Sequence, residues 1–558
     1  MSQKNLIWEL GCYSRSKMHL DNFAQVVISI IFLDELKRKN GLNYNNLNDD
    51  EELISYAESS LRDIDEKYLK IFKEKLTGLS KDQIQDLLYN LVFNNTEINR
   101  FDSTDQICNL IFKLMDVKNN EKIYDFGSGI GNFLLCSYLN NKNNELKNIE
   151  LIGSEINFNQ YIFSKMVMAI LDIKTSIQNG DYLLEENPEF NKAFVFPPIN
   201  IRNNTNNRDN DSNIGWGLLN HRSSYEWTYI DKLVRNLKDG DKVIALVSPK
   251  LLFHDADYEY RQELINKGLI EAIIQLPSGS LSFTSIKMNV LIFSKNNEKV
   301  KIINSEDLMD ASLNKTDKVD SAIEEIINVY NSDSVCLRTN EELSAARDIQ
   351  VEKLLLGKPV INDPVILSKV AEVFSGTQYS AKNFNYKLSN EKSKYKILTS
   401  TDIQDGIIFW NSLHYIDYND TKFDKYAVQK NDVIITSKSS KVKIAVIDVE
   451  PEEKVIVTGG MIIIRPNIKK LNPFFLKIFL ESNSGRQSLT LIQKGMSIIS
   501  LNPKYVALLQ ISCPNIEKQN QIANKFKSKL TSLLGLKKEM MKLEDIVNTY
   551  YDLEMESN

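Results

Sequence analysis

The spacing of hydrophobic and polar positions changes several times along the 558-residue chain. In residues 1–98 apolar residues recur at three- and four-residue steps, as in LISYAESSLRDIDEKYLKIFKEKL, which is typical of amphipathic helices. In residues 99–335 amphipathic stretches alternate with short apolar runs, namely KIYDFG, ELIGSE, AFVFPP, KVIALVSP, EAIIQLP and NVLIFS. Strands that alternate with helices predict a parallel, doubly wound sheet that helices cover on both faces.

The remaining third of the chain follows other patterns. Residues 336–366 are charged and predict a linker, and the short runs of residues 367–515, separated by turn signals such as QDG and VTGG, predict an α+β domain. Residues 516–558 again repeat apolar positions at helical spacing, which predicts one long helix that packs against another copy of the chain or against its own domain. The predicted fold class is therefore α/β, with a helical N-terminal domain, an α/β domain, an α+β domain and a C-terminal helix.

One segment between the predicted strands has no periodicity. NIRNNTNNRDNDSN, residues 200–213, is polar and rich in Asn. It predicts either a disordered surface loop or a substrate loop that a ligand orders.

Composition excludes several classes of protein. No stretch of 18 uncharged apolar residues occurs, and MSQKNLIWEL lacks the pattern of a secretory signal, so neither a membrane span nor secretion is predicted. The five cysteines contain no CxxC pair, which argues against a zinc ribbon or a disulfide scaffold and favours a cytoplasmic location. The four histidines have no metal-ligand spacing, so no metal site is predicted.

The net charge of −6 conceals an asymmetry. Residues 361–558 carry 27 Lys and Arg against 21 Asp and Glu, which leaves 41 against 53 for residues 1–360. The C-terminal part is therefore net +6 and the rest net −12. A positive C-terminal third is compatible with contacts to a phosphate backbone.

The most informative motif is IYDFGSGIGNFL, in which a strand leads through alternating glycines into a helix. Glycines at this spacing let a ligand approach the backbone at the carboxyl edge of a sheet. An acid after the second strand can accept hydrogen bonds from ribose hydroxyls, and an aspartate after the third can contact an adenine edge. This layout favours an S-adenosylmethionine pocket over an NAD site, whose first two features it shares. The alternative is a structural remnant of such a pocket. The candidate cofactor residues are Asp125, Gly127, Gly129, Gly131, Glu155 and Asp181.

After the fourth strand, AFVFPPIN resembles the motif of N6-adenine DNA methyltransferases, in particular the modification subunit of type I restriction enzymes. The resemblance implies a Rossmann-like S-adenosylmethionine methyltransferase domain at residues 99–335. The family has Asn-Pro-Pro-aromatic where this chain has Phe196, Pro197, Pro198 and Ile199. In the family the Asn side chain and the first Pro carbonyl accept hydrogen bonds from the adenine amino group, and the aromatic ring stacks on the flipped base.

Two of those three functional groups are missing here. Phe196 cannot accept a hydrogen bond, and Ile199 offers no stacking face. One hypothesis is therefore a sequence-specific DNA-binding protein that binds the cofactor without turnover. The alternative is an active restriction-modification adenine-N6 methyltransferase in which another residue, such as Asn200, replaces the missing acceptor.

A second resemblance covers the C-terminal third. LSKVAEVFSGTQYS and LIQKGMSIISLNPKYVALLQISCPNIEKQNQIANKF are similar to the specificity subunit of type I restriction enzymes. This implies a target-recognition domain for double-stranded DNA at residues 367–515 and a spacer helix at 516–558. Because one recognition half is present, the resemblance implies a homodimer through the helix, with intramolecular docking as the alternative, and restriction or other defence subunits as partners.

Some polar and aromatic residues have two interpretations each. Two lysine groups can contact phosphates or form a solvated face. Trp216 and Trp227 can stack on a base or lie in the core. The lysines are Lys438, Lys441 and Lys443, and Lys525, Lys527 and Lys529.

Overall fold

The computed structural model describes most of the chain. The described residues are 20–40, 51–93, 104–199, 214–306, 316–377, 388–389, 393–416, 421–493 and 499–529, without positions 182, 185, 282, 334, 358 and 440, together with 6, 9, 10, 540 and 543. The chain divides into two compact units, Met1–Leu355 and Leu356–Asn558. Residues 200–213, the Asn-rich segment, lie outside the described ranges, so both interpretations of it remain open.

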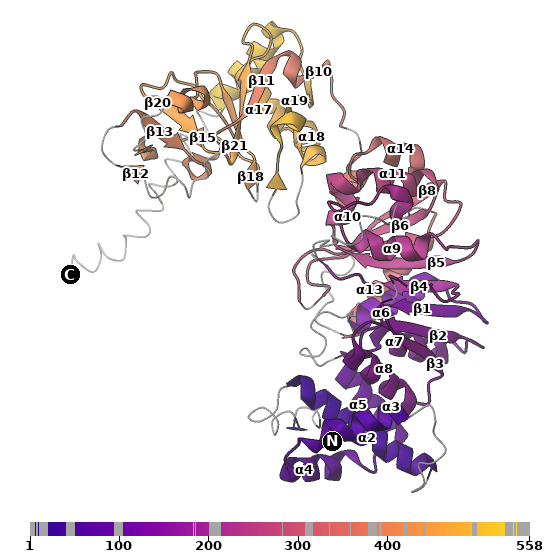
Figure 1. Ribbon diagram of the computed structural model, residues 1–558. Helices are drawn as coiled ribbons and strands as arrows, with labels where there is room; N and C mark the ends of the chain where they lie inside the picture. The colour runs from indigo at the N-terminus through magenta and orange to yellow at the C-terminus, as the bar shows by residue number, and fades with distance from the viewer. Residues whose placement is uncertain are drawn as a thin grey trace, which may run out of the picture. The chain divides into compact units, whose positions relative to one another are not determined.

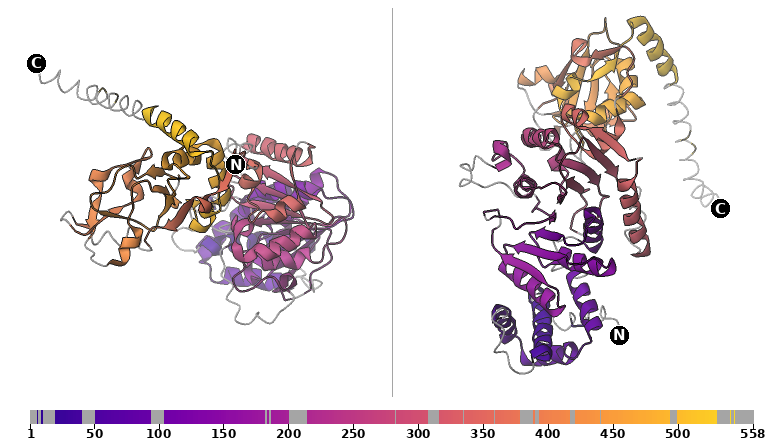
Figure 2. Two further views of the ribbon diagram at one scale, coloured as in Figure 1. Left: turned by 90° about the horizontal axis from the view of Figure 1, so that it is seen from above. Right: turned by 90° about the vertical axis from the view of Figure 1, so that its right-hand side faces the viewer.

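The first unit begins with helices whose apolar positions face inward. Its N-terminal helices are α2 (Leu20–Asn40), α3 (Glu51–Arg62), α4 (Glu66–Leu76) and α5 (Lys81–Phe93). In α3 the four-residue steps from Leu53 to Ala57 and Leu61 place all three side chains in the core. Figure 1 shows these helices (indigo) beyond strand β3 (Thr175–Asn179), where α2 packs on α8 (Phe158–Ile170), and Figure 2 shows the same helices in two further views.

Nine strands of the described residues form one sheet in the order β3-β2-β1-β4-β5-β7-β6-β8-β9. They are β1 (Lys122–Phe126), β2 (Glu150–Glu155), β3 (Thr175–Asn179), β4 (Lys192–Val195), β5 (Lys242–Val247), β6 (Ile270–Gln275), β7 (Asn289–Phe293), β8 (Lys299–Asn304) and β9 (Cys336–Thr339). Strands β1 to β5 are parallel, as predicted. The sheet as a whole is mixed, because β7 is antiparallel to β5 and β6 and β9 is antiparallel to β8. No helix crosses over between β6 and β7 in the described residues, so these neighbours pair antiparallel.

Helices cover both faces of the sheet (Figure 1), and the predicted α/β class is confirmed. On one face lie α6 (Asp105–Met115), α7 (Asn132–Asn143), α8 and α13 (Thr316–Asn331). On the other lie α9 (Glu226–Val234), α10 (Lys250–Phe253), α11 (Tyr258–Asn266), α14 (Asn340–Ala345) and α15 (Val351–Leu356). Alternate residues of β5 serve the two cores: Ile244 and Leu246 face the first, and Val243, Ala245 and Val247 the second.

Part of the segment predicted as a linker is folded. Residues 336–355 contain β9, α14 and most of α15 and belong to the first unit. Leu343, Ile349 and Val351 are buried in the second core, which explains why this charged segment packs despite its composition. The other domain boundaries stay predictions.

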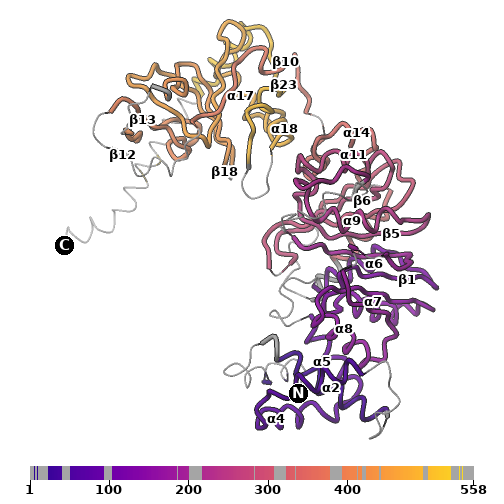
Figure 3. The backbone as a smooth tube through the Cα atoms, viewed as in Figure 1, coloured from indigo at the N-terminus to yellow at the C-terminus, as the bar shows by residue number. Residues whose placement is uncertain are grey.

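The second unit is rich in short strands, as expected for an α+β region. One four-stranded sheet contains β11 (Ala371–Ser375), β21 (Met461–Pro466), β17 (Val433–Thr436) and β19 (Ile444–Val446), and the other contains β12 (Leu388–Ser389), β16 (His414–Ile416), β13 (Tyr395–Leu398) and β20 (Lys454–Val457). Three further pairs are β10 (Pro364–Ile366) with β23 (Gln510–Ser512), β14 (Ile403–Gln404) with β15 (Ile407–Ile408), and β18 (Lys438–Ser439) with β22 (Ile499–Ser500). Figure 3 shows β12 and β13 at one end of this unit and α17 (Pro473–Glu481) and α18 (Asn483–Ile492) toward the other.

Shorter helices complete both units. They are α19 (Pro503–Ala507) and the 3-10 helices η1 (Ile214–Gly217), η2 (Asp255–Asp257), η3 (Leu367–Lys369), η4 (Ser400–Asp402), η5 (Trp410–Ser412) and η6 (Thr421–Tyr426). Among the residues that the structure describes, no helix combines the length and apolar character needed to cross a membrane.

The predicted C-terminal helix is described only at its start, where residues 516–529 are helical. Its first turns dock on their own unit. The buried Gln519 side chain donates to the carbonyl of Lys470 (2.9 Å) and accepts from the backbone N–H of Asn472 (2.8 Å), and Ala523 is buried. Nearly all of residues 530–558 lie outside the description, so the dimer stays a prediction.

Candidate functional site

The glycine turn between β1 and α7 has a backbone that side chains rarely adopt. Gly127, Gly129 and Gly131 have φ angles of +85°, +54° and +90°. A Cβ at Gly131 would lie 2.6 Å from the Ser164 hydroxyl, so this glycine lets α7 begin close against α8. A Cβ at Gly127 would meet nothing within 4 Å. The turn is therefore tightly packed on one side and open on the other.

The acid at the end of β2 holds the turn in place. Glu155 is buried, and its carboxylate accepts from the backbone N–H of Gly129 (2.8 Å) and of Asn157 (2.7 Å). A carboxylate has about four lone-pair sites, so two remain for ligand hydroxyls. Asp125, two residues before Gly127, is also buried.

The remaining predicted residues lie at the same carboxyl edge. Gly180, after β3, donates its N–H to the carbonyl of Glu155 (3.2 Å), and the next residue, Asp181, is half-buried and accepts from the N–H of Leu183 (3.2 Å). Residues 196–199 follow β4, which pairs with β1. The fold thus collects all ten candidate residues at one edge of the sheet, the usual position of ligand sites in α/β proteins.

The side chains of Phe196 and Ile199 are used for packing. The half-buried Phe196 ring stacks on Phe283, with ring centroids 6.4 Å apart and an interplanar angle of 27°. Pro197 is buried, and Ile199 packs against the same core as Phe196. Neither Phe196 nor Ile199 offers a polar atom to a substrate.

Two apolar side chains beside Glu155 were missed by the sequence interpretation. Ile156 is 67% exposed and Phe158 is 45% exposed, although most large apolar residues of this unit are buried. The sequence contained a signal for them, because the apolar residues Ile156 and Phe158 follow one and three positions after Glu155. They offer an apolar surface next to the carboxylate, as a nucleoside base requires.

The two tryptophans with open interpretations are core residues. Trp227 is fully buried, and Trp216 packs against the same core. Both contact the Tyr260 ring, at centroid distances of 5.2 Å and 5.8 Å. This favours the core interpretation over base stacking.

A further buried acid near this edge, Glu226, was also missed. Glu226 begins α9, is 4% exposed, and accepts from the backbone N–H of Ser248 (3.3 Å), directly after β5. Burial raises the pKa of the Glu226 carboxyl to about 7, although the hydrogen bonds from Ser248 oppose the rise. No motif reveals this, because Glu226 resembles an ordinary first-turn acid of an amphipathic helix.

Replacing this acid should change how stability depends on pH. The pKa of Glu226 is about 7 in the folded state against an ordinary 4.5, so the folded state holds the proton more tightly than the unfolded state. The stability that this proton contributes is therefore fully present below pH 4.5 and is lost as the pH rises from 4.5 through 7. Compared with Glu226→Gln, the wild type should lose up to about 3 kcal/mol of stability between about pH 4 and pH 8, the range that brackets the unfolded and folded pKa values. Urea unfolding with pulsed hydrogen exchange, which reports α9 separately, measures this.

The matched control is Glu259→Gln, because Glu259 is exposed on α11 of the same unit. It should show the pH dependence of the wild type. Parallel pH profiles for Glu226→Gln and the wild type would contradict the assignment of a titrating buried acid.

Family comparisons identify both units. Residues 97–355 match the family of N-6 DNA methylases, and residues 363–543 match the type I restriction modification DNA specificity domain. The chain joins an N-6 DNA methylase domain to a type I specificity domain. This confirms the two family resemblances in the predicted order.

Curated relatives are methylase subunits of type I restriction enzymes. The methylase domain is similar to the MpnII methylase subunit of Mycoplasma pneumoniae, at 24% identity over 262 residues, covering 42% of this chain and 46% of that protein. It is also similar to the MjaVII methylase subunit of Methanocaldococcus jannaschii, at 26% identity, covering 34% of this chain and 35% of that protein. The chain thus spans less than half the length of these relatives. A type I methyltransferase subunit from Streptococcus thermophilus matches with a TM-score of 0.46 and 19% identity over 62% of this chain and 99% of that one.

The methylase domain implies S-adenosylmethionine as its cofactor. The glycine turn fits this group in two respects. The space beside Gly127 is open, and the buried Ser128 hydroxyl has no hydrogen-bond partner among the described residues. Glu155, Ile156 and Asp181 lie at the same carboxyl edge of the sheet as this turn.

Proposed function

We propose that this chain binds S-adenosylmethionine and a specific DNA sequence without appreciable methylation of adenine N6. The observation that carries the proposal is the packed Phe196 ring at the position of the family's Asn, together with Ile199 at its aromatic position. An intact glycine turn beside a blocked substrate motif supports cofactor binding and argues against turnover. We propose that the protein acts in the cytoplasm.

The chain's own residues account for cofactor binding in this proposal. Asp125 and the three glycines shape the open side of the turn, and Glu155 accepts ribose hydroxyls with its remaining lone pairs. Ile156 packs on the adenine, and Asp181 faces its edge. When bound, the cofactor supplies an electrophilic methyl group on sulfur.

Turnover fails in this proposal for want of an acceptor. Adenine N6 attacks only when hydrogen bonds orient its lone pair, and the Pro197 carbonyl alone supplies one of the two acceptors that the family uses. Loss of a positioning hydrogen bond typically costs ~100- to 1000-fold in rate, and loss of the stacking ring adds to it. Together these losses amount to about a thousandfold or more.

The alternative function is an active adenine-N6 methyltransferase of a restriction-modification system. The intact cofactor turn favours it. It requires an acceptor from another residue, and Asn200, the sequence candidate, lies outside the described residues.

The proposed partners follow from the specificity domain. Double-stranded DNA is the ligand, because the family of residues 363–543 is a DNA specificity domain. A homodimer through the C-terminal helix would provide two recognition halves from one chain type. Restriction or other defence subunits are further proposed partners.

The deciding experiment expresses the protein in a host free of DNA methylation. Long-read sequencing measures adenine methylation, and sequencing of DNA that copurifies with the protein gives the bound motif. We expect a bound motif without a methyl mark. A methyl mark within the bound motif would overturn the proposal and establish the active enzyme.

A further inference from the structure

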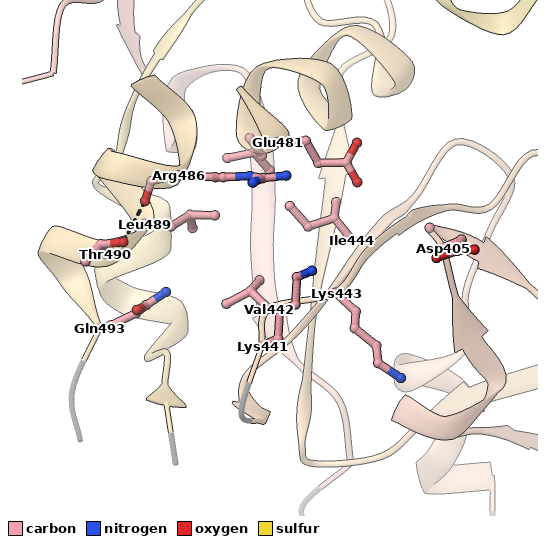
Figure 4. A pocket seen from close by; sticks show the side chains of 12 residues that line it. Asp405, Lys441, Val442, Lys443, Ile444, Glu481, Arg486, Leu489, Thr490 and Gln493 are labelled. Carbon is pink, nitrogen blue, oxygen red and sulfur yellow. Dashed lines mark hydrogen bonds between the residues drawn. The ribbon is translucent and has the colours of Figure 1, made fainter. Parts of the chain in front are cut away.

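The second unit contains a cavity of about 460 Å³ whose charged lining is mostly cationic. It is bordered by α18, by the connection from β18 to β19 and by the β14–β15 turn (Figure 4). Lys441, Lys443 and Arg486 line it, with Asp405 and Glu481 as its acids. We call it the Arg486 cavity.

The acids do not balance the cations. Glu481 forms an ion pair with the buried Lys477, so its charge is already neutralised inside the fold. Apart from this pair, the lining contains one acid, Asp405, and three cations. Such an excess in a concave surface attracts anions more strongly than the same charges on a flat one.

The three cations have different tasks. The Lys443 ammonium donates to the carbonyls of Ser400 (2.7 Å) and Ile403 (2.9 Å), and in Figure 4 it turns toward the segment of Asp405. Lys443 therefore connects the β14 segment to β19. Its ammonium group binds backbone carbonyls and not the phosphate that was one of its two predicted partners. Its charge remains, but its donors are engaged.

Arg486 has the opposite character. It is exposed on α18, its side chain reaches across the cavity in Figure 4, and within the described part of the chain no carboxylate lies within ion-pair distance of its guanidinium. Lys441 reaches the same cavity from another element. Two cations from elements 45 positions apart in the chain thus converge on one space. A guanidinium has a planar donor fork that fits a phosphate.

We propose that the Arg486 cavity holds a phosphate of the DNA backbone, with Arg486 and Lys441 as its ligands. This rests on the proposed DNA binding and deepens it by naming a contact that positions the duplex. Phosphate contacts fix register and orientation without reading bases. The ligand is a phosphate diester of duplex DNA; a free phosphate is the competing source.

The test is the salt dependence of binding to a duplex of unselected sequence, because the phosphate term is independent of sequence. Log affinity falls as log salt concentration rises, and each lost phosphate contact makes this slope about 0.9 less steep. Arg486→Gln should show this loss with about tenfold weaker binding at low salt, measured between about 50 and 200 mM salt by fluorescence anisotropy of the full chain. Arg486→Lys, which keeps the charge, should retain most of the slope.

The matched control is Lys430→Gln. Lys430 is exposed and lies at the end of the β17–β19 pair that is farther from the cavity. At that end Val433 pairs with Val446, whereas Ile435 pairs with Ile444 at the end near the cavity. The control removes one positive charge from the same unit and should keep the wild-type slope. Unchanged melting temperatures verify that the variants fold, as expected for exposed positions.

The outcomes separate the two proposals. Absence of duplex binding by the wild type overturns both the proposed DNA binding and the cavity. Wild-type binding with equal slopes for the wild type and Arg486→Gln overturns the cavity alone. Titration with orthophosphate tests free phosphate as the competing ligand. If orthophosphate binds to the wild type but not to Arg486→Gln, while both have the same salt slope for DNA, DNA is overturned as the occupant of the cavity.

Discussion

Gly127→Leu should abolish S-adenosylmethionine binding while the methylase domain stays folded. A side chain at this position enters the open space beside the turn, where nothing of the protein lies within 4 Å of a Cβ. If the cofactor occupies that space, we expect at least about a thousandfold weaker binding, equivalent to ~4 kcal/mol. Isothermal titration calorimetry with the full chain measures it.

Gly240→Leu is the matched control for this substitution. Gly240 has nearly the same backbone angle as Gly127, φ +88° against +85°, and a Cβ there also meets nothing within 4 Å. It lies in the exposed turn before β5, at the amino end of that strand. Both variants should lose a similar ~1–2 kcal/mol of stability from backbone strain, so a difference in cofactor affinity reports the site alone. Equal affinity in the two variants would refute the pocket assignment.

The second large effect concerns the substrate motif. Phe196→Asn combined with Ile199→Tyr should raise adenine-N6 methylation by about a thousandfold over the wild-type background. Asn supplies the missing acceptor and Tyr supplies a stacking face, while the Pro197 carbonyl is already present. Tritium transfer from labelled cofactor to DNA that carries the bound motif measures the rate.

Phe196→Leu combined with Ile199→Tyr is the control for this gain. It removes the ring that stacks on Phe283 without adding a hydrogen-bond acceptor. It therefore separates the effect of losing the Phe196 ring from the effect of the hydrogen bond that Asn would accept from adenine. We expect a much smaller gain in rate from it, because it adds the stacking face without the hydrogen-bond acceptor. Efficient methylation by the wild type, or an equal gain in both double variants, would show that the missing Asn does not limit turnover.

Local patterns explain why much of the candidate site was predictable. The order strand, glycine turn and helix depends on neighbours in sequence, and three glycines with positive φ angles confirm the turn. The position of Glu155 at the end of β2 follows from the length of the apolar run ELIGSE. What Glu155 contacts was not predictable, because its bond to the N–H of Gly129 depends on how β1 and β2 pair.

Other features depended on distant partners. Strand β7 pairs antiparallel with β5, and this direction depends on which strands become neighbours in the sheet. The continuous apolar pattern of NVLIF is compatible with a parallel or an antiparallel neighbour. Lys443 looked like Lys441 in sequence, yet the carbonyls of Ser400 and Ile403, about 40 positions away, bind only one of them. Arg486 carried no sequence signal at all.

By itself the sequence determined the methylase and specificity architecture, the glycine turn with its acids, and the apolar Phe196 directly before the two prolines. Each of these depends on residue type and on spacing over a few positions, which set local backbone preference and side-chain chemistry. Only the tertiary structure decided that Glu226 is buried, that Lys443 is engaged, and that Arg486 and Lys441 share a cavity. Burial and convergence depend on contacts between residues far apart in the chain, and those contacts exist only after the units pack.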